Sequence, residues 1–293
     1  MTSVETAYPD SLTVALGAVA VTVAVGAGPR ILGYGLPGEQ QVLAVLPDAV
    51  ITHPSIGTYR FLGGHRLWRA PEDPAVTYQP DEVGATTNTA EGRISLLGPA
   101  DRDGVGKEII VRQQGDVTEV VHVLRNEGER PVTTAPWAIT QFPAGGVAVI
   151  PQPAADPEAY LPNRSLVLWP YTDLSAPEVS FREGALEVKA TARPGRFKIG
   201  WPNRLGWLAY AKDDRLFVKW GPPHDDDFDY PDMGASAQCF RDERFLELET
   251  VGPLATLQPG DRVVHREWWT LRALDGASIA EVLASLSAPE GAR

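Results

Sequence analysis

The segment Val117-Thr-Glu-Val-Val-His-Val-Leu124 is rich in β-branched residues, and the turn-forming run Asn126-Glu-Gly-Glu129 follows it. Such a run closed by turn residues predicts a β-strand, here one that buries a single face. Upstream, Arg93–Leu97 and Glu108–Gln113 alternate apolar and polar residues, and glycine-containing turns separate them. This region therefore predicts neighbouring strands joined by short turns.

The same signals recur on both sides of this region. Leu12–Leu16 and Val19–Val25 predict a hairpin, and Pro131–Phe142 is predicted to pair with Val147–Pro151 across the turn Pro143-Ala-Gly-Gly146. Further predicted strands are Arg30–Gly35, Glu178–Arg182, Ala185–Lys189, Lys198–Trp201, Gly206–Lys212, Arg215–Trp220, Phe245–Val251 and Arg262–Ala273.

Helical signals are confined to the C-terminal part of the chain. Ser278–Leu286 is predicted to be a helix, because Ser278 and Glu281 have the spacing of a capping box. The short strands are expected to form antiparallel sheets packed face to face. We therefore predict one all-β domain over residues 1–293, a large antiparallel β-sandwich with one short C-terminal helix.

Charge and cysteine content exclude several classes of protein. The net charge of −12 argues against binding to nucleic acid or to an anionic membrane surface. A single cysteine, Cys239, cannot form an internal disulfide framework, so a disulfide-stapled secreted domain is excluded. We expect Cys239 to be a small buried hydrophobic residue.

The apolar run Leu12–Gly28 could be taken for a signal peptide or a membrane span. No Lys or Arg precedes Arg30, and three glycines interrupt the run. Both features favour two strands over a targeting or membrane helix, so we expect a cytoplasmic protein. The sequence leaves open whether it is a monomer or a homodimer.

Both ends of the chain resemble the galactose mutarotase-like (aldose 1-epimerase-like) superfamily. At the start, a strand pair precedes Gly28-Pro-Arg-Ile-Leu32. Near the end, Phe245-Leu-Glu-Leu-Glu-Thr-Val-Gly-Pro253, Leu257-Gln-Pro-Gly-Asp261 and His265-Arg-Glu-Trp-Trp-Thr-Leu271 follow in the order typical of that superfamily. The resemblance implies a large antiparallel supersandwich with a sugar-binding cleft on one concave face.

Shorter motifs, whose order is the specific part, resemble one branch of that superfamily more closely. They are Gly63-Gly-His-Arg-Leu-Trp68, Ala135-Pro-Trp-Ala-Ile-Thr140, Lys198-Ile-Gly200, Gly206-Trp-Leu-Ala-Tyr210, Tyr230-Pro-Asp232 and Glu247-Leu-Glu-Thr250.

Mutarotation requires a base for the anomeric hydroxyl and an acid for the ring oxygen. Mutarotases use a Glu and a His for these roles. Glu247 and Glu249 are candidates for the base, and because they are two apart on a strand, both point to one face. The sequence does not decide which of them faces a pocket, and a solvated sheet face is the alternative for both.

The resemblance also implies an Arg in the cleft. Arg66 fits this role, since its planar fork can hold sugar hydroxyls. The neighbouring His65 is a candidate acid or a structural histidine. Trp68 is a candidate for stacking on a sugar or for the core.

The usual catalytic His is missing. Mutarotases carry it in an Asn-His-x-Tyr-Phe stretch, and the corresponding Thr134–Thr140 holds Trp137 and no His. Trp137 can stack on a sugar but cannot protonate a ring oxygen. Lys198, His65 or His224 would have to act as the acid.

Four further residues are candidates for substrate binding. Lys198 and Lys219 have apolar sequence neighbours and either point into a pocket or extend to solvent. Tyr230 and Asp232 belong to the matched Tyr-Pro-Asp motif. The acidic loop around them lacks EF-hand spacing, and nucleotide-binding fingerprints are missing, so we expect neither metal nor cofactor.

Three functions remain open. The first is a protein that binds a small-molecule carbohydrate in a mutarotase-like fold, and the second is an aldose 1-epimerase or related sugar-modifying enzyme with a Glu base. The third is a non-catalytic structural or interaction module with a vestigial cleft. The fold does not distinguish them.

Overall fold

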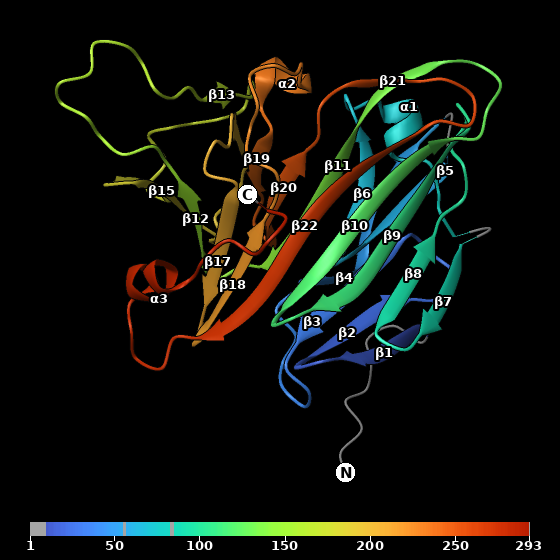
Figure 1. Cartoon of the computed structure of the whole chain (residues 1–293), viewed down its shortest axis with the longest axis horizontal. Helices are drawn as coiled ribbons and strands as arrows, with labels where there is room; N and C mark the ends of the chain where they lie inside the picture. The colour runs from blue at the N-terminus through green and yellow to red at the C-terminus, as the bar shows by residue number, and fades with distance from the viewer. Residues whose placement is uncertain (1–9, 55–56, 83–84, 293) are drawn as a thin grey trace.

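The computed structural model describes residues 10–54, 57–82 and 85–292, and these form two large antiparallel sheets that face each other (Figure 1). The first sheet has ten strands. In spatial order they are β1 (Ser11–Leu16), β2 (Val19–Ala24), β3 (Arg30–Gly35), β6 (His65–Ala70), β11 (Val132–Pro143), β20 (Phe245–Val251), β19 (Ala237–Arg241), β16 (Phe197–Trp201) and β13 (Val167–Leu168), with β21 (Ala255–Leu257) paired to β11.

The second sheet also has ten strands, in the order β14 (Val179–Arg182), β15 (Ala185–Lys189), β12 (Val147–Pro151), β17 (Trp207–Lys212), β18 (Arg215–Trp220), β22 (Arg262–Ala273), β10 (Val117–Asn126), β9 (Val105–Gln114), β8 (Arg93–Leu97) and β7 (Thr86–Ala90). A separate ribbon pairs β4 (Val45–His53) with β5 (Gly57–Gly63). All these pairings are antiparallel, which confirms the predicted all-β sandwich.

Three short helices lie outside the sheets of the described chain. The predicted C-terminal helix is α3 (Ile279–Ser285), and Ser278 and Glu281 form both hydrogen bonds of a capping box. The other two are single turns, α1 (Pro74–Thr77) and α2 (Pro231–Gly234). Residues after β22, including α3, pack on the outer face of the second sheet against Trp220 and Trp268. None of the helices in the described ranges has the length and apolarity to cross a bilayer.

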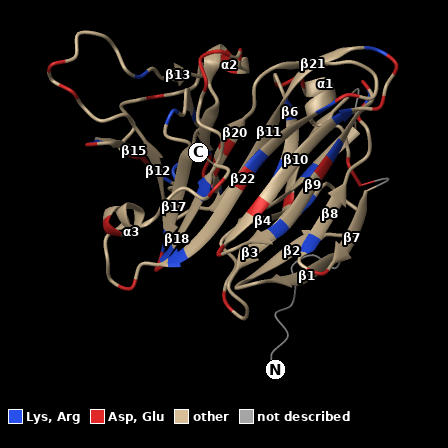
Figure 2. Cartoon of the chain, viewed as in Figure 1, with Lys and Arg blue, Asp and Glu red and all other residues tan. Residues whose placement is uncertain are grey.

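The space between the two sheets is filled by large apolar side chains. Tyr34 and Phe217 both contact Trp269 edge-on, and Phe142 stacks on Tyr210. Cys239 is fully buried in this interior, as predicted. Figure 2 shows acidic residues (red) along many of the connecting loops, so much of the negative charge lies outside this core.

Two details of the predicted strands are wrong. β10 is buried on both faces along Val117–Leu124, because long side chains of the flanking strands lie over its outward residues, as Arg112 of β9 and Arg266 of β22 do over Glu119. β11 and β12 do not pair with each other: β11 pairs with β6 and β20, and β12 with β15 and β17. The connection between them instead carries the chain from one sheet to the other.

Candidate functional site

A cleft of about 330 Å³ opens on the face of the first sheet that points away from the second sheet. Side chains of β6, β11, β16, β19 and β20 form its floor, and loop residues form its walls. Its aromatic lining consists of Phe61, Trp68, Tyr78, Trp137, Trp169, Tyr171, Phe240 and Phe245. An aromatic cleft with a few polar groups is typical of a small-molecule site.

Strand register determines which side chains meet on the floor. Trp68 lies opposite Trp137, while Arg66 lies opposite Ile139, which in turn lies opposite Glu249. Just before β6 the chain turns at Gly64, where φ is +73° and a Cβ would lie 2.0 Å from a backbone oxygen. Only glycine fits this turn, which places Arg66 and Trp68 on the cleft face.

Two buried ion pairs connect β20 to strands that are not its direct neighbours. Arg66 Nη2 donates to Glu247 Oε1 at 2.7 Å, across β11. Lys198 Nζ donates to Glu249 Oε2 at 3.1 Å, across β19. The side chains are 2% and 9% exposed in the first pair and 7% and 0% in the second. Their geometry is therefore held by the surrounding protein more than by solvent.

Aromatic rings hold both cations of these pairs. The Arg66 guanidinium carbon lies 4.1 Å from the centroid of Trp68, and Lys198 Nζ lies 4.8 Å from the rings of Trp137 and Trp169. Cation–π contacts of this length stabilise a desolvated cation and restrict its rotamers. The cleft therefore holds its charged groups in fixed positions before any ligand binds.

Some polar atoms of the two pairs are buried without a hydrogen-bond partner. Among the described residues, nothing hydrogen-bonds to Arg66 Nε or Nη1, or to Glu249 Oε1. Glu249 Oε2 instead accepts from Trp137 Nε1 at 2.6 Å as well as from Lys198. Buried polar groups usually have partners, so these atoms are exceptions within the described part of the site.

Burial raises the pKa of the Glu249 carboxyl, with Lys198 opposing the rise and Glu247 adding to it. A carboxyl with a raised pKa beside a second carboxylate is a common arrangement for acid–base chemistry. Glu247 and Glu249 share one face, as predicted. Glu247 lines the cleft directly, and Glu249 lies deeper, hydrogen-bonded to Trp137 and Lys198, which both line it.

Five of the predicted site residues thus line one cleft: Arg66, Trp68, Trp137, Lys198 and Glu247. Four aromatic residues of the lining were not predicted from the sequence: Phe61 on β5, and Tyr78, Trp169 and Tyr171 in loops. Tyr78 donates to Glu72 at 2.5 Å, which fixes this wall. These residues lie in loops or at the end of an irregular ribbon, where periodicity gives no signal of orientation.

Two other predicted site residues, His65 and Lys219, do not line the cleft. Both are fully buried between the two sheets, because His65 alternates with Arg66 along β6 and Lys219 projects inward from β18. The three donors of the Lys219 ammonium are satisfied: Nζ donates to Glu267 Oε1 at 2.7 Å, to Leu248 O at 2.9 Å and to Thr140 Oγ1 at 3.2 Å.

A directed hydrogen-bond chain continues from Thr140. The backbone oxygen of His265 can only accept, so with neutral imidazoles the protons lie on His122 Nδ1 and His65 Nε2, and the Thr140 hydroxyl donates to His65 Nδ1 at 2.9 Å. His65 Nε2 then donates to His122 Nε2 at 2.7 Å, and His122 Nδ1 donates to the backbone oxygen of His265. Each ring nitrogen of His65 and His122 has a partner when both imidazoles are neutral.

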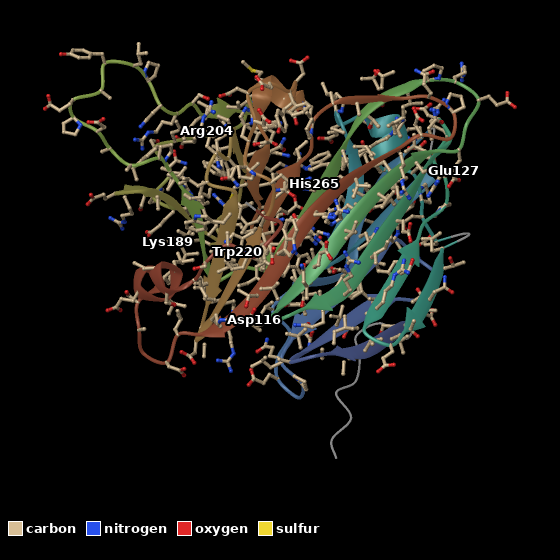
Figure 3. The ribbon with its side chains drawn as sticks, in the orientation of Figure 1. Asp116, Glu127, Lys189, Arg204, Trp220 and His265 are labelled. Carbon is tan, nitrogen blue, oxygen red and sulfur yellow. The ribbon has the colours of Figure 1, made fainter. Side chains whose placement is uncertain are left out.

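His265 joins the same network from β22, near the middle of Figure 3. Its Nε2 donates to Thr250 Oγ1 at 2.7 Å, and that hydroxyl donates to Glu267 Oε1 at 2.5 Å. Glu267 Oε2 accepts from Trp269 Nε1. No role for His122 or His265 could be predicted from the sequence, since their approach depends on packing between the two sheets.

His65, His122 and Glu267 could in principle hold a metal ion, since their ligand atoms lie within 4.8 Å of one another. The Glu267 carboxylate, however, is already paired with the Lys219 ammonium, and the two imidazoles are hydrogen-bonded to each other. A cation would have to displace a positive charge from a buried site. The donor set therefore fits a hydrogen-bonded network better than a metal centre.

Tyr230 and Asp232 lie beside the first sheet, outside the lining of the cleft. The Tyr230 ring stacks on His224 with centroids 4.5 Å apart, and Asp232 Oδ2 accepts from Gln238 Nε2 at 2.7 Å. Asp232 also has φ of +53° in α2. The structure therefore brings neither residue into contact with the two ion pairs.

Comparison with protein-family models and with curated sequences finds no match. Solved structures do match. A galactose mutarotase-like protein from Lactobacillus casei has a TM-score of 0.58 at 8% identity, covering 89% of this chain and 100% of that one. The fold is galactose mutarotase-like.

Two other structures share this mutarotase-like fold. A candidate aldose 1-epimerase from Escherichia coli K12 has a TM-score of 0.53 at 12% identity, over 90% of this chain and 99% of that one. A TPR-domain containing protein from Parabacteroides distasonis has a TM-score of 0.59 at 12% identity, and the match covers 96% of this chain and 49% of that longer one. At these identities the likeness establishes the fold, and function has to be argued from the cleft.

Proposed function

We propose that the cleft of the first sheet binds a small-molecule carbohydrate. The observation that carries this proposal is the presence of two buried ion pairs, Arg66–Glu247 and Lys198–Glu249, between aromatic walls. Atoms of Arg66 and Glu249 in these pairs have no hydrogen-bond partner among the described residues. Sugars present both apolar C–H faces and many hydroxyls. Trp68 and Trp137 match the faces, and the free N–H groups and carboxylate oxygen match the hydroxyls.

The open cleft, lined by convergent polar groups, supports this function over a vestigial structural module. The net charge of −12 supports a ligand that is neither nucleic acid nor membrane. A cytoplasmic protein, monomeric or homodimeric, is part of the same proposal. The cytoplasmic location is supported by Cys239, a single buried free thiol that forms no disulfide bond.

Titration calorimetry with a panel of free saccharides tests this proposal. Glu247→Gln removes the charge that pairs with Arg66 and is expected to weaken binding at least about tenfold, since hydrogen bonds to charged groups are among the strongest. Glu187→Gln is the matched control, because Glu187 is an ion-paired strand residue of the second sheet. Equal affinity of the Glu247 variant and wild type, or no saccharide binding at all, would contradict the proposal.

Interconversion of sugar anomers is a second candidate, favoured by the Lys198–Glu249 pair. Glu249, with its raised pKa, would accept the proton of the anomeric hydroxyl, and Lys198 would donate one to the ring oxygen. Lys198 would thereby replace the missing His. Glu249→Gln is expected to abolish the change in optical rotation of a bound aldose while binding persists, and an unchanged rate would exclude this mechanism.

A further inference from the structure

One edge of the cleft carries two arginines that take no part in the ion pairs described above. Arg196 immediately precedes β16, and Arg244 immediately precedes β20. Phe197 lies opposite Arg241 on β19, and Arg241 lies opposite Leu246. The two arginines therefore lie at the same end of the two strands that flank β19, and both line the cleft.

These two guanidinium groups have no carboxylate partner within the described ranges, whereas Arg66 and Lys198 each have one. Asp242, which also lines the cleft, accepts with Oδ1 from the backbone N–H groups of Arg244 and Phe245, at 2.8 and 3.2 Å. In a chain of net charge −12, the lining of this cleft carries four cations and three carboxylates, namely Arg66, Arg196, Lys198, Arg244, Glu72, Asp242 and Glu247.

Arg196 and Tyr171 both belong to the lining of the cleft. Burial raises the pKa of Tyr171 to about 12, and the charge of Arg196 opposes this rise, which places the guanidinium near that wall. On the floor of the same cleft, Arg66 is 2% exposed and has N–H groups without a hydrogen-bond partner. Donors for oxygen atoms therefore extend from the floor to this edge.

Arginine binds oxyanions because its planar fork matches the geometry of carboxylate and phosphate. Two like charges facing the same space repel each other, and a bound anion would remove this repulsion. Extending the carbohydrate proposal, on which this inference rests, we propose that the ligand is an anionic saccharide whose phosphate or carboxylate binds to Arg196 and Arg244. Its sugar ring lies deeper, against Trp68 and Trp137.

Calorimetry at low ionic strength with a neutral hexose, its 6-phosphate, its uronic acid and inorganic phosphate tests this inference. One or both anionic saccharides are expected to bind at least about tenfold more tightly than the neutral hexose, with affinity falling as salt is added. The tighter of the two identifies the group as phosphate or carboxylate.

The double variant Arg196→Gln/Arg244→Gln is expected to lose this tenfold preference and to keep the affinity for the neutral hexose. Both residues are exposed, so the variant should fold, which an unchanged thermal midpoint would verify. Arg164→Gln, at an exposed loop arginine outside the cleft lining, is the matched control and should behave as wild type.

Two results would overturn the inference. If the neutral hexose binds as tightly as its anionic derivatives, or the double variant keeps the preference, the arginines are ordinary surface residues while the carbohydrate proposal stands. If inorganic phosphate binds but no saccharide does, both proposals fail.

Discussion

As the pH is lowered from 6.5 towards 4, the free energy of unfolding is expected to fall by up to about 4 kcal/mol per pH unit. The cause is the buried set His65, His122 and His265. Burial lowers the pKa of His122 to about 4 and that of His265 to about 3, and it lowers the pKa of His65 well below its usual value.

An unfolded imidazole titrates near pH 6.5, so in this window the unfolded chain binds three protons that the native protein does not. The stability that each neutral histidine contributes to the native protein is fully present above about pH 6.5. It is lost as the pH falls from 6.5 towards the pKa of that histidine in the folded state. Glu267, whose pKa is held well below its usual range chiefly by Lys219 against the effect of burial, adds to the loss below about pH 4.5. Glu249, with its raised pKa, opposes the loss by at most about 1.4 kcal/mol per unit.

Urea unfolding at half-unit pH intervals between 7.5 and 4.5 measures this slope. His122→Gln is expected to reduce the slope by about 1.4 kcal/mol per unit, because one titrating group is removed. A wild-type slope near zero, or one that His122→Gln leaves unchanged, would show that the native network accepts protons freely.

Lys219→Met is expected to destabilise the protein by about 3–5 kcal/mol at pH 7.5, the usual cost of leaving a buried charge without its partner. Lys219 and Glu267 are both 0% exposed, and the ammonium also donates to Thr140 and to the backbone of β20. Methionine keeps the length of the side chain, so lost packing contributes little to this effect.

Chemical denaturation of single and double variants tests this expectation. Adding Glu267→Gln to Lys219→Met should recover part of the loss, because the uncompensated carboxylate is removed. Lys212→Met, at an exposed ion pair with Asp213, is the control and should cost less than about 1 kcal/mol. A similar cost at both lysines would mean that the buried pair contributes no more than a surface pair.

Alternation and turn residues predicted most of the sandwich, including β3, β8, β12, β15 and β18 with their observed bounds. The strands that were not predicted lack these signals for physical reasons. β7 (Thr86–Ala90) is a mostly exposed edge strand of small polar residues, and β4 contains Pro47 and Asp48. β19 (Ala237–Arg241) is covered on both faces, so its sequence does not alternate.

For the cleft, spacing along β20 correctly placed Glu247 and Glu249 on one face. It could not identify their partners, because the Arg66–Glu247 pair joins residues 181 positions apart. Alternation along β6 does show that His65 and Arg66 point to opposite faces, a constraint that the sequence analysis did not use. The loop walls with Trp169 and Tyr171 depend on tertiary packing alone.

The buried polar network also bears on how the chain folds. Its hydrogen bonds join residues far apart in sequence: 75 positions between His65 and Thr140, 57 between His65 and His122, and 48 between Lys219 and Glu267. Such contacts form slowly, since long loops must close first. The network is complete only when both sheets have met, so it should form after the rate-limiting step. Lys219→Met should therefore accelerate unfolding while leaving the refolding rate nearly unchanged, which stopped-flow fluorescence would measure.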